Sequence, residues 1–189
     1  MGKAALADDE PVFRMSREEY RAWAERQPTG RFERVAGVVV AMAPERAGHN
    51  RRKRRAYEAL DRAVRAAGLL CEVYTDGITV EVDDSDYEPD AVLHCGDRLP
   101  DDAVAVPNPL LIVEVLSPST SASDRAWKLR EYFRLPSLRH YLIVWSDKQQ
   151  VVHHRRLDDG EIETHTAIGG EIRLYPPGIT IAVEDIYSQ

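Results

Sequence analysis

The 189-residue chain has few cysteines and no apolar run near the ~18 residues of a membrane span. Its two cysteines, Cys71 and Cys95, do not have the spacing of a metal site or a redox motif, so we expect reduced thiols in a cytoplasmic protein. The first ten residues, MGKAALADDE, lack the apolar core of a signal peptide. Leu6 also occupies the position at which a myristoylation signal requires serine or threonine. The sequence therefore predicts a protein without a membrane anchor.

An excess of positive charge is absent as well. The net charge of -7 argues against a broad electrostatic attraction to nucleic acid. The basic residues are nevertheless unevenly distributed, because residues 51–55 form the unbroken block RRKRR. We regard Arg51, Arg52 and Arg55 as candidates for phosphate contacts, although a helix with such a block must also turn some of these side chains toward solvent.

Capping and turn residues divide the N-terminal part of the chain into short elements. Residues 1–15 are expected to form a flexible arm. The capping box of Ser16 and Glu19 then predicts a short helix. Residues 31–42 have the pattern of a hairpin with its turn at Ala36-Gly37.

The next part of the chain combines a helix with short strands. Apolar residues recur every three or four positions over residues 49–67, as in a helix. Two short strands at 69–74 and 78–82 flank Asp76-Gly77, which is a strong hairpin signal. The acidic segment at residues 83–86, DDSD, lacks the glycine of a calcium-binding loop, and we interpret it as a solvated turn.

The C-terminal half consists of strands around one helix. A helix capped by Thr120 or Ser123 is expected to run to about Leu135, where Pro136 ends it. This order of elements predicts a single α/β (α+β) domain at residues 16–189, with helices flanking one central mixed sheet. Strands are expected near residues 91–93, 110–116, 141–145, 151–155, 161–166, 171–175 and 179–183.

The most informative stretch is LLIVEVLSPST at residues 110–120. Its apolar run is typical of a strand buried on both faces, yet it contains the carboxylate of Glu114. A second acid, Asp90, opens another apolar run, and pairing of the two strands would bring the carboxylates close together. At ~4 Å two such charges repel by roughly 4 kcal/mol at an effective dielectric of about 20. A proton or a cation is therefore required at this place.

Lys128 lies on the helix that follows this stretch and shares a helix face with Tyr132, so it can point toward the sheet. Paired carboxylates suit Mg²⁺ or Mn²⁺, which prefer oxygen ligands. Such an ion and a lysine together can activate water and stabilise charge on a phosphate, which is the chemistry of phosphodiester cleavage. The same residues could instead be structural, with Asp90 in a turn and Lys128 on a solvated face.

One combination of motifs extends over most of the chain. It consists of Pro89-Asp90, of Glu114 within LLIVEVLSPST, of Lys128 and Tyr132, and of the segment LPSLRHYLIVW. This combination resembles the Uma-two family of endonucleases, in the PD-(D/E)XK restriction-endonuclease-like superfamily. The resemblance covers about residues 16–185, and EVLSPST with the lysine helix is its most specific part. Upstream positions that match the family's opening pattern are Glu33, Gly37, Met42, Pro44 and His49.

The resemblance implies a restriction-endonuclease-like core and a metal site. Asp90 and Glu114 would be ligands of Mg²⁺, with the Val115 carbonyl as a further ligand. Glu33 and His49 would be additional members of the site.

One departure from the superfamily pattern concerns the lysine. The pattern places it two residues after the glutamate, where this chain has Leu116. The resemblance implies that Lys128 takes this role from the following helix.

The leading hypothesis is a Mg²⁺-dependent endonuclease in which Asp90, Glu114 and Lys128 hydrolyse DNA through a metal-activated water. By analogy with small nucleases, it would act as a homodimer. The alternative is a nuclease-fold protein that binds nucleic acid or a partner protein without cutting, which the low net charge and the displaced lysine keep open. A purely structural oligomer is a third possibility.

Overall fold

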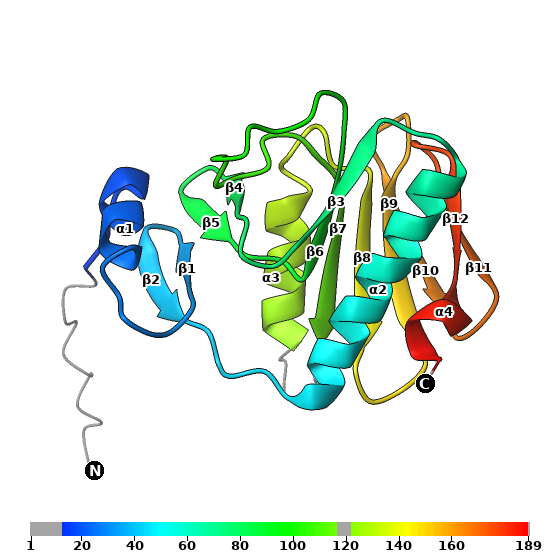
Figure 1. Cartoon of the computed structure of the whole chain (residues 1–189), viewed down its shortest axis with the longest axis horizontal. Coiled ribbons are helices and arrows are strands. Elements are labelled where there is room, and N and C mark those ends of the chain that lie inside the picture. The colour runs from blue at the N-terminus through cyan, green and yellow to red at the C-terminus, as the bar shows by residue number, and fades with distance from the viewer. Residues whose placement is uncertain (1–12, 117–121, 189) are drawn as a thin grey trace, which may run out of the picture.

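The computed structural model describes residues 13–116 and 122–188. Most of the expected arm at residues 1–15 and the SPST segment with Thr120 lie outside the described residues, whereas Ser123 lies within a helix. The helices are α1 (Arg17–Ala24), α2 (Ala47–Ala66), α3 (Ala122–Tyr132) and α4 (Val183–Tyr187) (Figure 1). The strands are β1 (Phe32–Val35), β2 (Val38–Ala41), β3 (Cys71–Thr75), β4 (Val80–Val82), β5 (Ser85–Tyr87), β6 (Ala91–Cys95), β7 (Pro109–Leu116), β8 (His140–Trp145), β9 (Val151–Arg156), β10 (Ile162–Ala167), β11 (Glu171–Leu174) and β12 (Ile179–Ala182).

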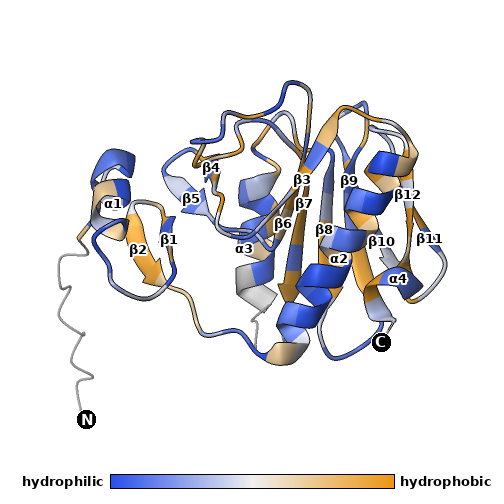
Figure 2. Ribbon diagram, viewed as in Figure 1, coloured by the Kyte–Doolittle hydropathy of each residue, from blue (hydrophilic) through white to orange (hydrophobic). Residues whose placement is uncertain are grey.

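A six-stranded sheet in the order β10-β9-β8-β7-β6-β3 forms the centre of the molecule. Its β7 and β8 strands are parallel and its other neighbours are antiparallel, which confirms the predicted mixed sheet. Leu60 of α2 packs in a core with Val113, and Tyr132 of α3 packs in a second core with Ile112. Because alternate residues of β7 face opposite ways, the two helices cover opposite faces of the sheet. Figure 2 shows the apolar strands beside the hydrophilic outer surface of α2.

Two smaller sheets complete the fold, so the prediction of one sheet was incomplete. One has the order β2-β1-β5-β4, and the other consists of β11 and β12. The hairpin predicted around Asp76-Gly77 is wrong, because β3 pairs with β6 and β4 pairs with β5. Asp76 forms ion pairs with Lys53 and Arg31, so this turn is held by charge and not by strand pairing.

The N-terminal elements agree with the sequence pattern. The Ser16 hydroxyl accepts a hydrogen bond from the Glu19 amide at 3.2 Å, and the Glu19 carboxylate accepts one from the Ser16 amide at 2.8 Å. This confirms the capping box, which begins α1. The hairpin within residues 31–42 is confirmed by the antiparallel pairing of β1 with β2.

The acidic segment differs from the prediction of a solvated turn. Only Asp83 and Asp84 are exposed, whereas residues 85–87 form the buried strand β5. Asp86 is 1% exposed and accepts hydrogen bonds from Arg34 at 2.6 Å and from Arg17 at 2.7 Å. The two guanidinium groups supply the partners that a buried carboxylate requires. They fix β5 against β1 and α1.

The two cysteines also differ from the prediction. Cys71 in β3 lies directly opposite Cys95 in β6, and the two form a disulfide. Their separation of 24 residues gives no indication of this pairing, which depends on strand register. The expectation of reduced thiols is therefore wrong, and because disulfides are rare in the cytosol, the cysteines no longer favour a cytoplasmic location.

We expect the disulfide to stabilise the edge of the large sheet. Closing a loop of this length contributes roughly 3 kcal/mol in the chain-entropy description. Urea unfolding with and without dithiothreitol should show this difference, and a Cys71→Ser/Cys95→Ser variant should be insensitive to the reductant. Reaction of two thiols in the unfolded, unreduced protein would contradict the pairing.

A buried histidine pair joins β8 to β9. The Nε2 atom of His140 lies 2.8 Å from the Pro176 carbonyl, which can only accept, so this nitrogen carries the hydrogen. The Nδ1 atom of His140 then accepts from Nε2 of His153 at 2.9 Å. Burial lowers the pKa of His140 to about 4, and the charges of Arg155 and Arg139 act in the same direction. Burial likewise lowers the pKa of His153 to about 3, together with the charges of His140 and Arg155.

This pair should make stability depend on pH. The folded protein keeps both rings neutral, whereas the unfolded chain protonates them near pH 6.5. Stability should therefore be lost as the pH falls from about 6.5 toward 4, by up to about 1.4 kcal/mol per pH unit for each histidine. Urea unfolding over this pH range tests the slope. His153→Gln can still donate to His140 but cannot titrate, so an unchanged slope in this variant would refute the assignment.

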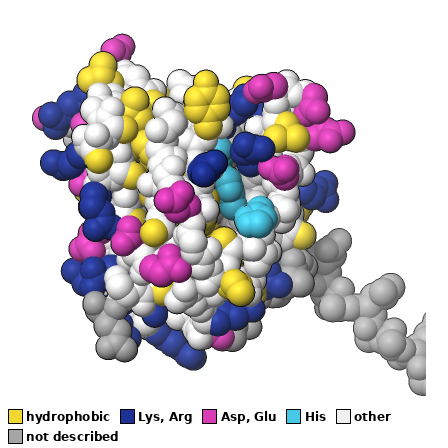
Figure 3. Space-filling view, turned by 90° about the vertical axis from the view of Figure 1, so that its right-hand side faces the viewer, with side chains coloured by type: hydrophobic (Ala, Val, Ile, Leu, Met, Phe, Trp, Pro, Cys, Tyr) yellow, Lys and Arg dark blue, Asp and Glu magenta, His cyan; other side chains and the backbone are white. Residues whose placement is uncertain are grey.

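The far end of the large sheet, with β10, β11, β12 and α4, forms one side of the molecule (Figure 3). Acidic and basic side chains are interspersed on this side, with histidines among them. The face in this view is therefore not uniformly positive, as a surface that binds the phosphate backbone of a nucleic acid would be.

Within the described part of the chain, no helix combines the length and apolar character needed to cross a membrane.

Candidate functional site

The site lies where β6 and β7 are neighbours in the large sheet. Ala91 pairs with Val113, so continuation of this antiparallel register places Asp90 opposite Glu114. The Asp90 amide donates to the Val113 carbonyl at 3.1 Å, and the Val115 amide donates to Oδ2 of Asp90 at 2.6 Å. Asp90 and Glu114 are each only 6% exposed. The strand pairing thus brings two buried carboxylates together, as the sequence suggested.

Helix α3 brings two partners to Glu114. Nζ of Lys128 lies 3.0 Å from Oε1 of Glu114, and the Tyr132 hydroxyl donates to the same oxygen at 2.7 Å. Lys128 also lies 3.2 Å from Oε1 of Glu33, which comes from β1 of the small sheet. The Glu88 amide donates to this Glu33 oxygen at 3.1 Å. The lysine that is missing next to Glu114 in sequence is therefore supplied by a helix packed on the sheet.

Helix α2 brings two partners to Asp90. Nε2 of His49 lies 3.2 Å from both oxygens of the Asp90 carboxylate. Nζ of Lys53 lies 3.2 Å from Oδ1. His49 is among the site residues expected from the sequence, whereas Lys53 is not, because it lies within the basic block at residues 51–55. Its spacing from Ala56 and Leu60, on the buried face of α2, is the signal that could have revealed an inward-facing lysine.

Further charged residues surround these two carboxylates. Lys53 contacts Glu45 and lies 2.9 Å from Asp76. Arg31 contacts both of these acids and also Glu88, at 2.7, 2.7 and 3.0 Å. Carboxylates thus outnumber permanent cations in this connected cluster. Its acids are Glu33, Glu45, Asp76, Glu88, Asp90 and Glu114, and its cations are Arg31, Lys53 and Lys128.

The environments of the paired acids separate their pKa values. Burial raises the pKa of Glu114 to about 7, since it outweighs the opposing charge of Lys128, and the charges of Asp90 and Glu33 add to the increase. Burial acts in the same direction on Asp90, but the hydrogen bond and charge of His49, the Val115 amide and Lys53 together lower its pKa. Asp90 is thus the ionised member near neutral pH, and Glu114 is the member that can hold a proton.

The bases respond to the same charges. Burial alone would lower the pKa of Lys128, but the charges of Glu114 and Glu33 raise it above its ordinary value. The pKa of His49 is raised, chiefly by its hydrogen bond to Asp90. Burial opposes ionisation of Lys53, yet its contacts with Glu45 and Asp76 raise its pKa. Both lysines are therefore charged at neutral pH.

The donor set is compatible with a divalent cation. Carboxylate oxygens from adjacent strands are the ligands that Mg²⁺ and Mn²⁺ prefer. Among the described residues, one ligand atom from each of Glu45, His49 and Asp90 lies within 4.8 Å of the others, which is close enough to share an ion. The excess of acids over permanent cations also favours an additional positive charge here.

The basic block of α2 is divided between different environments. Arg51 is exposed, whereas Arg52 donates to the Ile186 carbonyl at 3.2 Å and lies 4.7 Å from the ring centre of Tyr187. Arg55 is partly buried and lies 3.4 Å from Glu58. Arg52 therefore contacts α4, and Arg51 is the member of this trio turned most toward solvent.

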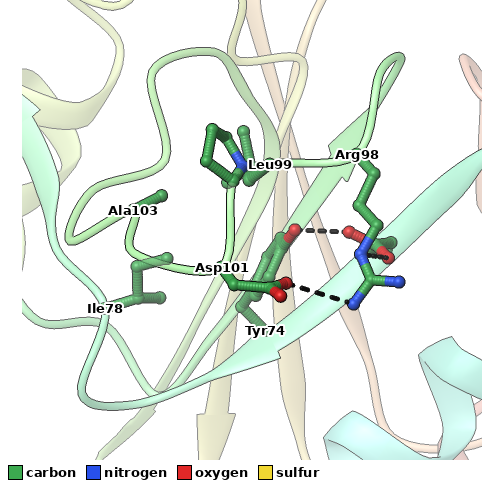
Figure 4. A pocket seen from close by; sticks show the side chains of 8 residues that line it. Tyr74, Ile78, Arg98, Leu99, Asp101 and Ala103 are labelled. Carbon is green, nitrogen blue, oxygen red and sulfur yellow. Dashed lines mark hydrogen bonds and ion pairs between the residues drawn. The ribbon is translucent and has the colours of Figure 1, made fainter.

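A separate cavity of about 290 Å³ lies beside β3 and the loop that follows β6 (Figure 4). Arg98 reaches toward it but forms ion pairs with Glu72 and Asp101 at 3.8 and 3.5 Å. Tyr74, Ile78 and other residues of this region complete the lining. None of the predicted site residues lines the cavity, so the buried charge cluster is the better candidate for chemistry.

The motif, the sheet and the lysine helix together indicate a nuclease family. Residues 17–184 match the Uma2 family, whose description reads "Putative restriction endonuclease". The chain belongs to the Uma2 family. The resemblance inferred from the sequence is thereby confirmed, and the family supports nuclease chemistry on a nucleic-acid substrate.

Two proteins of Synechocystis sp. and one solved structure are similar to this chain. It is 31% identical to uncharacterized protein slr1290 of Synechocystis sp., over 94% of this chain and 93% of that protein. It is 27% identical to uncharacterized protein sll1609 of the same organism, over 71% of this chain and 77% of that protein. A crystal structure of a putative nuclease belonging to DUF820 from Anabaena variabilis has a TM-score of 0.74 at 14% identity and covers 92% of this chain and 98% of its own. At that identity the likeness shows the fold alone.

Tyr132 offers a test of the Uma2 site that does not require a substrate. Tyr132→Phe removes the hydroxyl that donates to buried Glu114, and we expect a loss of about 2 kcal/mol in the free energy of unfolding. A double-mutant cycle with Glu114→Met, which cannot accept this hydrogen bond, isolates the interaction when measured by urea unfolding. Equal losses in the presence and absence of Glu114→Met would contradict a specific hydrogen bond.

Proposed function

We propose that this Uma2 protein is a Mg²⁺- or Mn²⁺-dependent endonuclease that hydrolyses DNA. The observation that carries the proposal is the pair of buried carboxylates, Asp90 and Glu114, with the ammonium group of Lys128 on Glu114. A structural ion pair needs one carboxylate for each cation. This site instead gathers more acids than permanent cations around the strands that the family motif marks.

Asp90 and Glu114 would hold the ion, with the Val115 carbonyl as a third ligand. The Val115 amide already fixes one oxygen of Asp90, so a single stretch of β7 orients both acids. His49 contributes a ring nitrogen beside Asp90. A bound ion supplies Lewis-acid stabilisation of phosphate charge and lowers the pKa of water.

The side chains of α3 and β1 complete the proposed catalytic centre. Lys128 would stabilise the negative charge that develops on the scissile phosphate. Glu33 and Glu114 hold its ammonium group from two sides, which fixes its position before a substrate arrives. Tyr132 limits the rotation of Glu114 through its hydrogen bond.

The proposed substrate is DNA, contacted through the basic block of α2. Arg51 and Arg55 would contact phosphates, while Arg52 would support the helix through its contact with α4. The family match over residues 17–184 supports one catalytic domain at residues 16–189. We extend the proposal to a homodimer, because two copies of the site could address the two strands of a DNA duplex.

The proposal predicts the loss of activity in two variants. Asp90→Asn removes a ligand and Lys128→Met removes the cationic helper, so each should reduce Mg²⁺-dependent nicking of plasmid DNA by at least roughly 10²-fold. Calorimetry should show that Asp90→Asn also loses Mn²⁺ binding. Arg173→Met removes an exposed charge from the remote β11 strand and should retain full activity.

Nicking retained by either Asp90→Asn or Lys128→Met would contradict these roles. A wild-type protein that forms a tight DNA complex without any metal-dependent product would instead support the alternative, a nuclease-fold protein that binds without cutting. The low net charge and the displaced lysine are the observations that favour this alternative.

A further inference from the structure

We propose that Lys53 takes the place of a second divalent cation beside Asp90, so that the site binds one metal ion and not two. This inference rests on the proposed function for the first ion, between Asp90 and Glu114. It concerns the other side of Asp90, where α2 meets the turn after β3. The chemistry there is that of a cation enclosed by carboxylates.

The ammonium group of Lys53 is enclosed by three acids from separate parts of the chain. Glu45 comes from the segment before α2, Asp76 from the turn after β3, and Asp90 from the start of β6. The lysine side chain is only 5% exposed. The ammonium group donates hydrogen bonds to Glu45 and Asp76 and lies 3.2 Å from Oδ1 of Asp90. Three carboxylates thus surround the cation.

A metal ion would find suitable ligands at the same place. Ligand atoms of Glu45, His49 and Asp90 lie within 4.8 Å of one another, although Lys53 already contacts two of these residues. Asp90 would then be shared between this position and the one beside Glu114, an arrangement that suits a pair of divalent ions. Lys53 supplies positive charge there permanently, because it is attached to α2 and cannot dissociate.

The position of Lys53 in sequence explains why its charge reaches this point. It lies one helical turn after His49, so both side chains project from α2 toward Asp90. The neighbouring Arg52 turns instead to α4. Arg52 therefore provides a matched control on the same helix. Arg52→Met removes one positive charge and leaves Lys53 in place among the three acids.

The test is the number of Mn²⁺ ions bound, measured by titration calorimetry and by electron paramagnetic resonance of free Mn²⁺. The wild type should bind one ion. Lys53→Met leaves Glu45, Asp76 and Asp90 without their shared cation and should bind one ion more than the wild type. Lys53→Arg keeps the charge, and Arg52→Met leaves the acids covered, so both should bind the same number as the wild type.

Adding Glu45→Gln to Lys53→Met should remove the extra ion. Should Lys53→Met fail to fold, Lys53→Met/Asp76→Asn reduces the repulsion among the acids and keeps the ligands Glu45, His49 and Asp90, so it should also gain one ion. A folded Lys53→Met or Lys53→Met/Asp76→Asn variant that binds no additional ion would overturn the inference, as would two ions in the wild type. A wild type that binds none, beside a Lys53→Met variant that binds one, would refute the proposed function and support this inference.

Discussion

The burial of Asp90 and Glu114 on neighbouring strands is the constraint on which the site depends. Two carboxylates in an apolar sheet are tolerated only when nearby groups offset their desolvation and their mutual repulsion. The structure meets this requirement from both faces of the sheet. Helix α2 supplies His49 and Lys53 to Asp90, and α3 supplies Lys128 to Glu114. The helices that bury the sheet thus also carry its counter-charges.

The small sheet contributes to the same balance from a third direction. Arg34 and Asp86, each 1% exposed, form an ion pair that fixes β1 against β5. Since alternate residues of a strand face opposite ways, Glu33 then projects to the other side and reaches Lys128. A buried pair on one face of β1 therefore positions a site residue on the other. This relation connects the N-terminal hairpin to the candidate site.

The lysine illustrates how a fold can replace a sequence motif. The superfamily pattern places lysine two residues after the glutamate, and Leu116 in this chain packs in the core instead. Lys128 reaches Glu114 because α3 crosses the face of the sheet on which Glu114 lies, with Tyr132 one turn later on the same side. The fold thus places an ammonium group beside Glu114 from a helix and not from the strand itself.

The sequence by itself determined the elements whose signals are local. The capping box at Ser16, the hairpin at Ala36-Gly37 and the apolar β7 strand around Glu114 depend on neighbouring residues, and the motif around Glu114 identified the family. Tertiary structure alone decided which distant segments meet. Strand register joined Cys71 to Cys95, and ion pairs with Lys53 and Arg31 replaced the hairpin expected at Asp76. Lys53 itself showed no local sign of its partners, because the acids that surround it are brought together only by the packing of α2 on the sheet.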